Sequence, residues 1–230
     1  VALKKKVNDH LTLRTTTGTY YRLLNLYEIA GDGAGILPRP GRGVNNVALP
    51  VFPLPEEGTQ WDVSAIWDGR LFGGDGKVQL TYFGRKSKNL LQLYRCGFDF
   101  FCYTNDARGQ ADGLELQTNL SWKKWDVDLA ATYLHLTAET TDTSPSGLSA
   151  GTGYLPIAPS CQPTLEGVLR LTYRPDRKTS FFTEVNYTGR MYIDMYLDKI
   201  QTALTTINLG IKHNFTKDLQ LVAGVNEDRK

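Results

Sequence analysis

The 230-residue chain lacks any long run of apolar residues, since no stretch approaches the 18 or more that a membrane helix requires. This excludes helical membrane spans. Membrane strands are not excluded, because their lipid-facing and water-facing residues alternate and keep the average hydropathy low. The chain also lacks an excess of one charge, with 26 basic and 24 acidic residues giving a net charge of +2. Nucleic acid is therefore not an expected partner.

Cysteine is scarce, with three residues in the chain. Cys96 and Cys102 bracket a short segment, and a disulfide between them would suit an oxidising compartment such as the periplasm or the cell surface. The alternative is two unpaired thiols. Cys161 is left over and indicates nothing.

Patterns that carry catalysis or metal binding are missing. His10, His135 and His213 lie in separate segments without metal-ligand spacing, so no metal site is predicted. The glycine-rich stretches Gly31 to Gly35 and Phe72 to Gly76 lack the strand-loop-helix context of a phosphate loop and are explained by turns. We expect no cofactor, no catalytic residues and no enzyme activity.

What the chain does contain is period-two alternation in segment after segment, which predicts an all-β, antiparallel protein. From Trp125 to Thr137, one face reads Trp125, Val127, Leu129, Ala131 and Tyr133, and the other reads Asp126, Asp128, Ala130 and Thr132. About nine strands are predicted in this way. They are 11–18, 60–68, 77 to about 93, 114–122, 125–137, 165–174, 181–190, 207–215 and 219–225.

The connections between these strands favour a membrane barrel over a soluble β-sandwich, which alternates equally well. Tight turns, such as Trp122 to Trp125, are interleaved with predicted long loops at 23–58, 86–110, 138–162 and 191–202. Short and long connections in turn are typical of outer-membrane barrels, with periplasmic turns on one rim and extracellular loops on the other. Charges in mid-strand, including Glu115 and Glu184, must also face water.

In the stretches 15–35, 54–69, 80–93, 103–117, 184–196 and 209–230, the local motifs and their order resemble those of the TonB-dependent receptors of the bacterial outer membrane. Thr15 to Gly35 is similar to the family's Gly-Tyr-Arg element and the Pro-Asn-Leu-Tyr-Glu type motif after it, with Leu24 in place of the proline. Leu54 to Gly69 resembles the family's Pro-Glu strand start, and Leu80 to Leu93 its aromatic-x-Arg segment. Tyr103 to Gln117, Glu184 to Tyr196 and Leu209 to Lys230 follow in the family's order.

The resemblance implies a 22-stranded barrel, preceded by an N-terminal plug that carries a TonB box. We therefore expect residues 1–230 to be a C-terminal portion of the barrel, with the plug and the first half of the barrel absent from this chain. The implied partners are outer-membrane lipid, TonB through that plug, and the remaining barrel segment or plug, possibly on a separate chain. The implied location is the bacterial outer membrane.

The implied function is transport of a scarce nutrient, such as a ferric siderophore or a similar metal chelate, captured by extracellular loops and passed through the barrel. Aromatic and cationic residues near the loops are the candidate ligand contacts. They are Tyr20, Tyr21, Arg22, Tyr27, Tyr94 and Arg95. The alternative function is a non-transport outer-membrane barrel, either a structural part of an envelope complex or a surface enzyme.

Overall fold

The computed structural model describes residues 1–32, 54–95, 101–140, 155–157, 162–193 and 200–229. Its long strands, in chain order, are β2 (Leu11–Arg22), β3 (Glu56–Leu71), β4 (Gly74–Arg95), β5 (Phe101–Ser121), β6 (Trp125–Thr140), β8 (Leu165–Tyr173), β9 (Thr179–Thr188), β12 (Leu204–Asn214) and β13 (Gln220–Arg229). The shorter elements are β1 (Ala2–Lys6), β7 (Leu155–Ile157), β10 (Met191–Tyr192), β11 (Ile200–Gln201) and the helix α1 (Leu26–Ala30).

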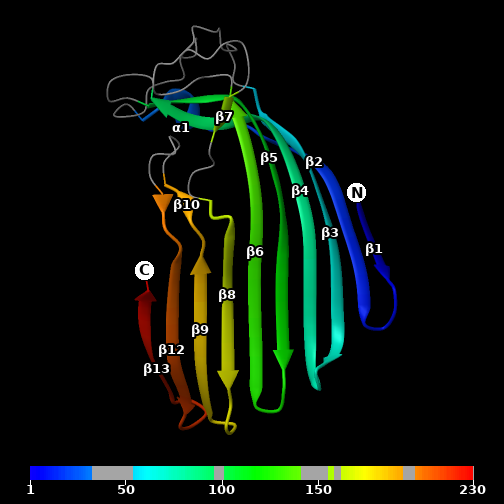
Figure 1. Ribbon diagram of the computed structural model, residues 1–230, viewed down its shortest axis with the longest axis vertical. Helices are drawn as coiled ribbons and strands as arrows, with labels where there is room; N and C mark the ends of the chain where they lie inside the picture. Colours follow the sequence, from blue (N-terminus) through cyan, green and yellow to red (C-terminus); the bar gives the residue numbers. More distant parts are fainter. Residues whose placement is uncertain (33–53, 96–100, 141–154, 158–161, 194–199, 230) are drawn as a thin grey trace.

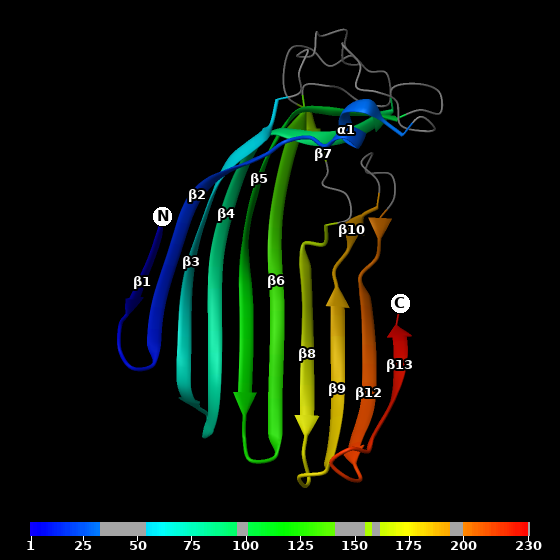
Figure 2. The same ribbon diagram turned by 180° about the vertical axis from the view of Figure 1, so that it is seen from behind.

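One antiparallel sheet contains nearly all of these strands. Within the described residues it has eleven strands, in the order β1-β2-β3-β4-β5-β6-β8-β9-β12-β13, with β7 paired to β6. Each strand of the path therefore lies beside its neighbour in the chain, and β10 and β11 form a separate pair. The sheet is open and curved, with β1 and β13 at its two edges (Figures 1 and 2). The prediction of an all-β antiparallel fold is confirmed.

All nine predicted strands are present, and β1 is one that the prediction missed. The strand reads Ala-Leu-Lys-Lys-Lys and pairs with β2 from Ala2 opposite Thr16 to Lys6 opposite Thr12. Three consecutive lysines hide any alternation of polarity, and all five residues are exposed. The strand exists because its backbone hydrogen-bonds to β2, which hydropathy does not reveal.

The predicted loop at 86–110 is wrong over most of its length. β4 has 22 residues and β5 has 21, and they stay paired as far as Arg95 opposite Phe101. The register shifts between Lys88 and Leu90 and again between Leu90 and Gln92, and Asn89 has a positive φ of 55°. These shifts are β-bulges, which break the period of two and made paired strands read as a loop.

The two ends of the sheet differ, and we name them by their connections (Figure 1). At the turn rim, adjacent strands are joined by the short segments 7–10, 72–73, 122–124, 174–178 and 215–219. At the loop rim, β2 and β3 are joined by residues 23–55, which include α1, and β6 and β8 by residues 141–164, which include β7. The alternation of short and long connections was therefore predicted correctly, apart from the β4–β5 hairpin.

The two faces of the sheet differ in polarity. The apolar face contains a cross-strand row of Val63, Tyr82, Leu114, Tyr133 and Leu165, whose exposed fractions are 50%, 46%, 44%, 49% and 42%. The adjacent row belongs to the polar face, and reads Ser64, Thr81, Glu115, Thr132 and Glu166. Ser64 and Thr81 are buried, with their hydroxyl oxygens 3.0 Å apart. A water-soluble protein buries its apolar side chains, and this sheet exposes them.

Ion pairs and hydrogen bonds engage several charged groups of the polar face. Arg170 lies 3.1 Å from the carboxylate of Glu184, and Asn208 donates to the same carboxylate at 3.1 Å. Asp62 accepts a hydrogen bond from Thr16 and lies 3.8 Å from Arg14. The mid-strand charges thus share one surface, as the alternation predicted.

No helix within the described ranges is long and apolar enough to cross a membrane.

Candidate functional site at the loop rim

The helix α1 begins the segment that follows β2, and its first turn determines where its side chains lie. Asn25 is the N-cap, its side chain accepts from the backbone N–H of Glu28 at 2.9 Å, and the Glu28 carboxylate accepts from the N–H of Asn25 at 2.8 Å. This capping box satisfies two backbone donors that a helix start would leave unpaired. It also holds the Glu28 carboxylate toward the end of β2.

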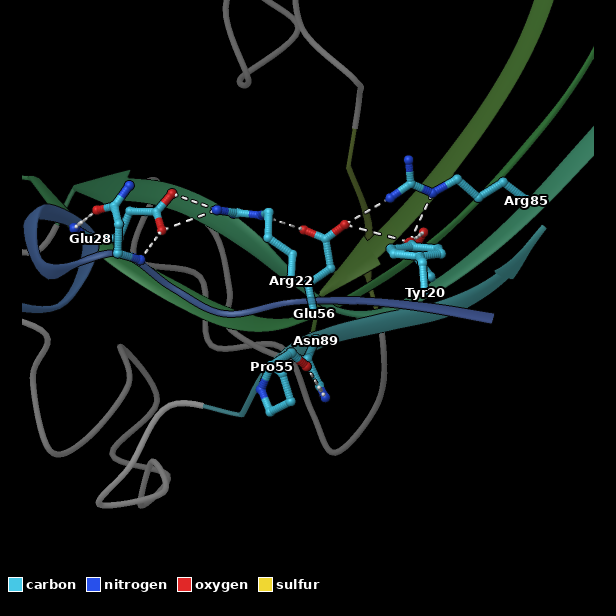
Figure 3. A network of polar contacts seen from close by, with 9 residues as sticks. Tyr20, Arg22, Glu28, Pro55, Glu56, Arg85 and Asn89 are labelled. Carbon is cyan, nitrogen blue, oxygen red and sulfur yellow. Dashed lines mark hydrogen bonds and ion pairs between the residues drawn. The ribbon is translucent and has the colours of Figure 1, made fainter. Parts of the chain in front are cut away.

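Arg22, the last residue of β2, connects this helix to the sheet (Figure 3). Its Nη1 lies 3.0 Å and 3.1 Å from the two carboxylate oxygens of Glu28, and its Nε lies 3.5 Å from Oε2 of Glu56. The hydrogen bond with Glu28 raises the pKa of the Arg22 guanidinium, with both carboxylates adding to the effect and desolvation opposing it. Arg22 is therefore a fixed cation between two carboxylates.

Glu56, the first residue of β3, is the buried centre of the arrangement, with 8% of its surface exposed. Its Oε1 accepts from Nη2 of Arg85 at 2.9 Å and lies 3.5 Å from the hydroxyl of Tyr20. Burying a carboxylate is costly unless charged or polar donors surround it. Arg22, Arg85 and Tyr20 supply those donors from two other strands.

Tyr20 lies between these charged groups. Its hydroxyl oxygen accepts from Nε of Arg85 at 2.8 Å and lies 2.5 Å from the hydroxyl of Ser87, while the Arg85 guanidinium lies 4.0 Å from the ring centroid. The ring covers Gly58, where an added Cβ would stand 2.7 Å from Cε1 of Tyr20. Only glycine leaves room for this ring position.

We call this set the rim network, and its members are Tyr20, Arg22, Glu28, Glu56, Arg85 and Ser87. The residues from β2, β3 and β4 all lie on the polar face, because Tyr20 is registered with Gly58 and Gly58 with Ser87. Two guanidinium groups balance two carboxylates. The arrangement joins three strands and α1 through charge-assisted bonds, which are stronger than neutral ones.

The six residues predicted as ligand contacts lie in different surroundings. Tyr20 and Arg22 belong to the rim network. Tyr21 lies on the apolar face with 75% of its surface exposed, and Tyr27 lies in α1 with 46% exposed. Tyr94 and Arg95 end β4, paired with Cys102 and Phe101, and their side chains fall outside the described part of the structure.

The predicted disulfide stays a prediction. Cys96 lies outside the described residues, and Cys102 is described only as a backbone position in β5.

Sequence reasoning missed four members of the rim network, namely Glu28, Glu56, Arg85 and Ser87. All four lie within stretches that carry the family resemblance, but the resemblance does not show that their side chains meet. Their positions depend on cross-strand register, which places Ser87 beside Gly58 although they are 29 residues apart in the chain. Register is the information that a single sequence does not supply.

Candidate metal ligands do not gather in the described ranges, where no three His, Cys, Asp or Glu residues stand close enough to hold one ion.

Solved structures with a similar fold include receptors and transporters. The chain is similar to the copper transporter OprC, with 17% identity and a TM-score of 0.72, over 98% of this chain and 32% of that one. It is also similar to the siderophore receptor PiuA from Acinetobacter baumannii (18% identity, TM-score 0.67, 97% of this chain and 30% of that one). The ferric yersiniabactin uptake receptor FyuA from Yersinia pestis gives 16% identity and a TM-score of 0.66, over 98% and 31%. The chain thus spans about a third of the length of these structures.

No curated protein matches the sequence. The family model described as TonB dependent receptor-like, beta-barrel matches residues 3–226, which is nearly the whole chain. The strand order, the two rims and the two faces agree with that barrel. The chain belongs to the TonB-dependent receptor family, in its β-barrel.

Proposed function

We propose that the protein containing this chain takes up a metal chelate, such as a ferric siderophore, through the outer membrane in a TonB-dependent manner. Proteins of this family lie in the outer membrane of Gram-negative bacteria and act as receptors and transporters, not enzymes. PiuA is a siderophore receptor, FyuA takes up ferric yersiniabactin and OprC transports copper, which supports a metal-containing cargo. A non-transport barrel is the alternative.

The observation that carries the proposal is the inverted polarity of the sheet. Large apolar side chains such as Val63 and Tyr133 are half-exposed on the apolar face, whereas Ser64 is fully buried on the polar face. Such a sheet is stable where lipid contacts the apolar face and a hydrated or plugged lumen contacts the polar face. A lumen lined with paired charges is the route that a polar chelate requires.

Within this function, the rim network has a supporting role at the mouth of the lumen. Arg22 and Arg85 are both engaged by Glu56, so their charges are already balanced. We assign Tyr20 and Arg22 to holding the start of the segment 23–55 on the barrel wall. The exposed Tyr27 of α1, with Tyr94 and Arg95 at the loop rim, supplies aromatic and cationic contacts for an anionic chelate, whereas Tyr21 lies on the face that contacts lipid.

Energy for transport comes, in this proposal, from TonB acting on a plug that lies outside this chain. The polar face that such a plug would cover is rich in hydrogen-bonding groups, including Asp62, Glu115 and Glu184. A plug that packs against this polar face can separate from the barrel wall without exposing apolar area of the wall.

Uptake of radioactive ⁵⁵Fe tests the proposal in cells that carry or lack the gene for this chain. Each of several ferric siderophores is supplied at nanomolar concentration, with and without tonB. We expect at least one chelate to be taken up only when both genes are intact, and the restored gene to return uptake. Uptake that is unchanged by deletion of tonB would overturn the proposal. Increased detergent sensitivity without any transport loss would support the non-transport barrel.

A further inference from the structure

The turn rim carries cationic side chains that the rest of the described structure does not neutralise. Lys123 and Lys124 lie in the β5–β6 turn, Arg177 and Lys178 in the β8–β9 turn, and Lys217 in the β12–β13 turn, and all five are exposed. Among the described residues, no hydrogen bond or ion pair engages any of the five side chains. Unpaired, clustered cations of this kind attract anionic partners.

The acidic residues of the same turns do not offset this charge. Asp176 accepts hydrogen bonds from the backbone N–H groups of Lys178 and Thr179 at 2.7 Å and 2.8 Å, so its carboxylate is turned toward its own backbone. Asp218 is the other acidic residue of these turns. Five unpaired cations against two carboxylates leave a positive surface.

Two of the turns are joined, and an open hollow of about 500 Å³ lies where they meet. The backbone N–H of Asn214 donates to the carbonyl oxygen of Lys178 at 2.9 Å, which holds the β8–β9 and β12–β13 turns side by side. Lys178 and Lys217 line the hollow together with Asn214, Phe215 and Thr216. The hollow is within the size range of small-molecule sites.

The lining combines the groups that recognise a phosphate ester. Lys178 and Lys217 each offer an ammonium group with three donors. The Thr216 hydroxyl oxygen accepts from the N–H of Leu219 at 3.0 Å, so its own proton remains free to donate. Phe215 adds an apolar surface that is 52% exposed, with its ring 4.6 Å from that of His213.

Apolar side chains of the sheet begin directly beside this hollow. Leu219 and Leu221 are 59% and 50% exposed, and Phe181 on the adjacent strand is 45% exposed. Trp125 and Tyr173 pack against each other with ring centroids 4.7 Å apart, near the same rim. Aromatic residues beside a cationic rim mark the level where a membrane interface meets a barrel.

The short turns of outer-membrane barrels face the periplasm, so this hollow lies at the headgroup level of the periplasmic leaflet. We propose that the hollow between residues 174–178 and 215–219 binds the headgroup phosphate of an anionic phospholipid. Lys178, Lys217 and Thr216 hold the phosphate, while Phe215 and Leu219 contact the glycerol and the start of an acyl chain. The surplus positive charge selects against a headgroup that carries its own ammonium group.

Native mass spectrometry of the intact receptor in detergent tests the proposal. The protein is titrated with phosphatidylglycerol, with phosphatidylethanolamine of the same acyl chains, and with free glycerol phosphate. We expect phosphatidylglycerol to bind at least tenfold more tightly than either of the others. Free glycerol phosphate binding as tightly would assign the hollow to a soluble phosphate, and equal binding of the two lipids would overturn the selection by charge.

The double variant Lys178→Gln/Lys217→Gln is expected to lose at least tenfold in affinity for phosphatidylglycerol. The matched control is Lys86→Gln/Lys88→Gln, which removes two exposed lysines from β4 near the loop rim and should bind as the parent does. Equal losses in the two variants would show a general charge effect and contradict the site.

A second measurement needs no variant. Phosphatidylglycerol with a photoreactive diazirine near its headgroup is crosslinked to the parent receptor, and labelled peptides are identified by mass spectrometry. Label on residues 174–178 and 215–219 is expected. Label spread evenly along the apolar face would overturn the proposal. Iron uptake is scored separately, so loss of lipid binding with normal uptake distinguishes this inference from the transport proposal.

Discussion

At the scale of single residues, the ring position of Tyr20 depends on the absence of a side chain at Gly58. A Cβ there would stand 2.7 Å from Cε1 and 2.9 Å from the hydroxyl oxygen of Tyr20, and would also meet the carbonyl oxygen of Lys86. The Lys86 carbonyl belongs to the backbone of β4, which cannot move aside as a flexible side chain can. We therefore expect Gly58→Ala to displace Tyr20 and to destabilise the folded protein by about 1–3 kcal/mol. Urea unfolding of the intact receptor in lipid vesicles measures this change.

Gly18 provides the control for that substitution. It lies on the same strand as Tyr20 and on the same face of the sheet, and an added Cβ there would meet no atom within 4 Å. Gly18→Ala should leave the unfolding midpoint within error of the parent. If the two substitutions cost the same, the strain would come from the strand backbone in general and not from Tyr20.

Asp176 gives a residue-scale prediction for pH. The backbone N–H groups of Lys178 and Thr179 donate to its carboxylate and lower its pKa below the ordinary value of 3.8. The folded turn therefore favours the ionised form. Its stabilisation is fully present above pH 3.8 and is lost as the pH falls through the lower, folded-state pKa.

The ¹³C shift of the Asp176 carboxyl carbon, followed by NMR in detergent, should show a midpoint below 3.8. In Asp176→Asn the side-chain oxygen still accepts both hydrogen bonds, and the turn should keep its geometry without the pH dependence. A carboxyl midpoint at or above 3.8 would contradict the two hydrogen bonds.

At the scale of elements, strands with one clearly apolar face were predictable from the sequence. Strands that are held in the sheet only by backbone pairing with a neighbour were not. β6 and β8 alternate over most of their length, and their place in the sheet follows from hydropathy. β1 is a run of lysines, and the outer halves of β4 and β5 lose their alternation at the bulges around Asn89. In these parts the backbone partner determines the structure.

The rim network was predictable in part for the same reason. Tyr20 and Arg22 lie in a stretch with a recognisable resemblance, next to the strand end that would carry a site. Glu56 reaches them from a position 34 residues after Arg22, and Arg85 from a position 29 residues after Glu56. Only the cross-strand register brings the three together.

The capping box of α1 can be separated from the ion pair that attaches α1 to the sheet. Asn25→Ala removes the cap and should destabilise the helix by about 1 kcal/mol. Amides of residues 26–30 should then exchange with deuterium about fivefold faster, as measured by mass spectrometry. Glu28→Gln keeps a side-chain acceptor for the Asn25 N–H but loses the ion pair with Arg22.

We expect Glu28→Gln to change helix exchange less than Asn25→Ala does. It should instead speed exchange at the end of β2, because Arg22 keeps only the longer contact with Glu56. An equal effect of both variants on α1 would show that the cap and the ion pair act as one unit.

At the scale of the whole molecule, strand lengths predict how far the sheet extends beyond the membrane. β8, β9 and β12 have 9, 10 and 11 residues, which is the length that spans a bilayer. β4 and β5 are about twice as long. Their outer halves must therefore project past the lipid on the loop side.

Cysteine labelling in intact cells tests this orientation. In a background with the three native cysteines replaced by serine, Lys88→Cys near the loop rim should react with a membrane-impermeant maleimide. Lys123→Cys in a turn should react only after the outer membrane is permeabilised. Reaction of Lys123→Cys alone in intact cells would reverse the assignment of the two rims, and reaction of both positions, with a periplasmic marker protein unlabelled, would refute it.

The extended β4–β5 hairpin has a consequence for the survival of the protein at the cell surface. Proteases bind their substrates as single extended strands, and most residues of this projection already use their backbone groups to pair with a neighbouring strand. Cleavage would first require the ladder to open. A projecting segment built as paired strands can therefore be long and still resist digestion, where a loop of the same length would present many cleavable bonds.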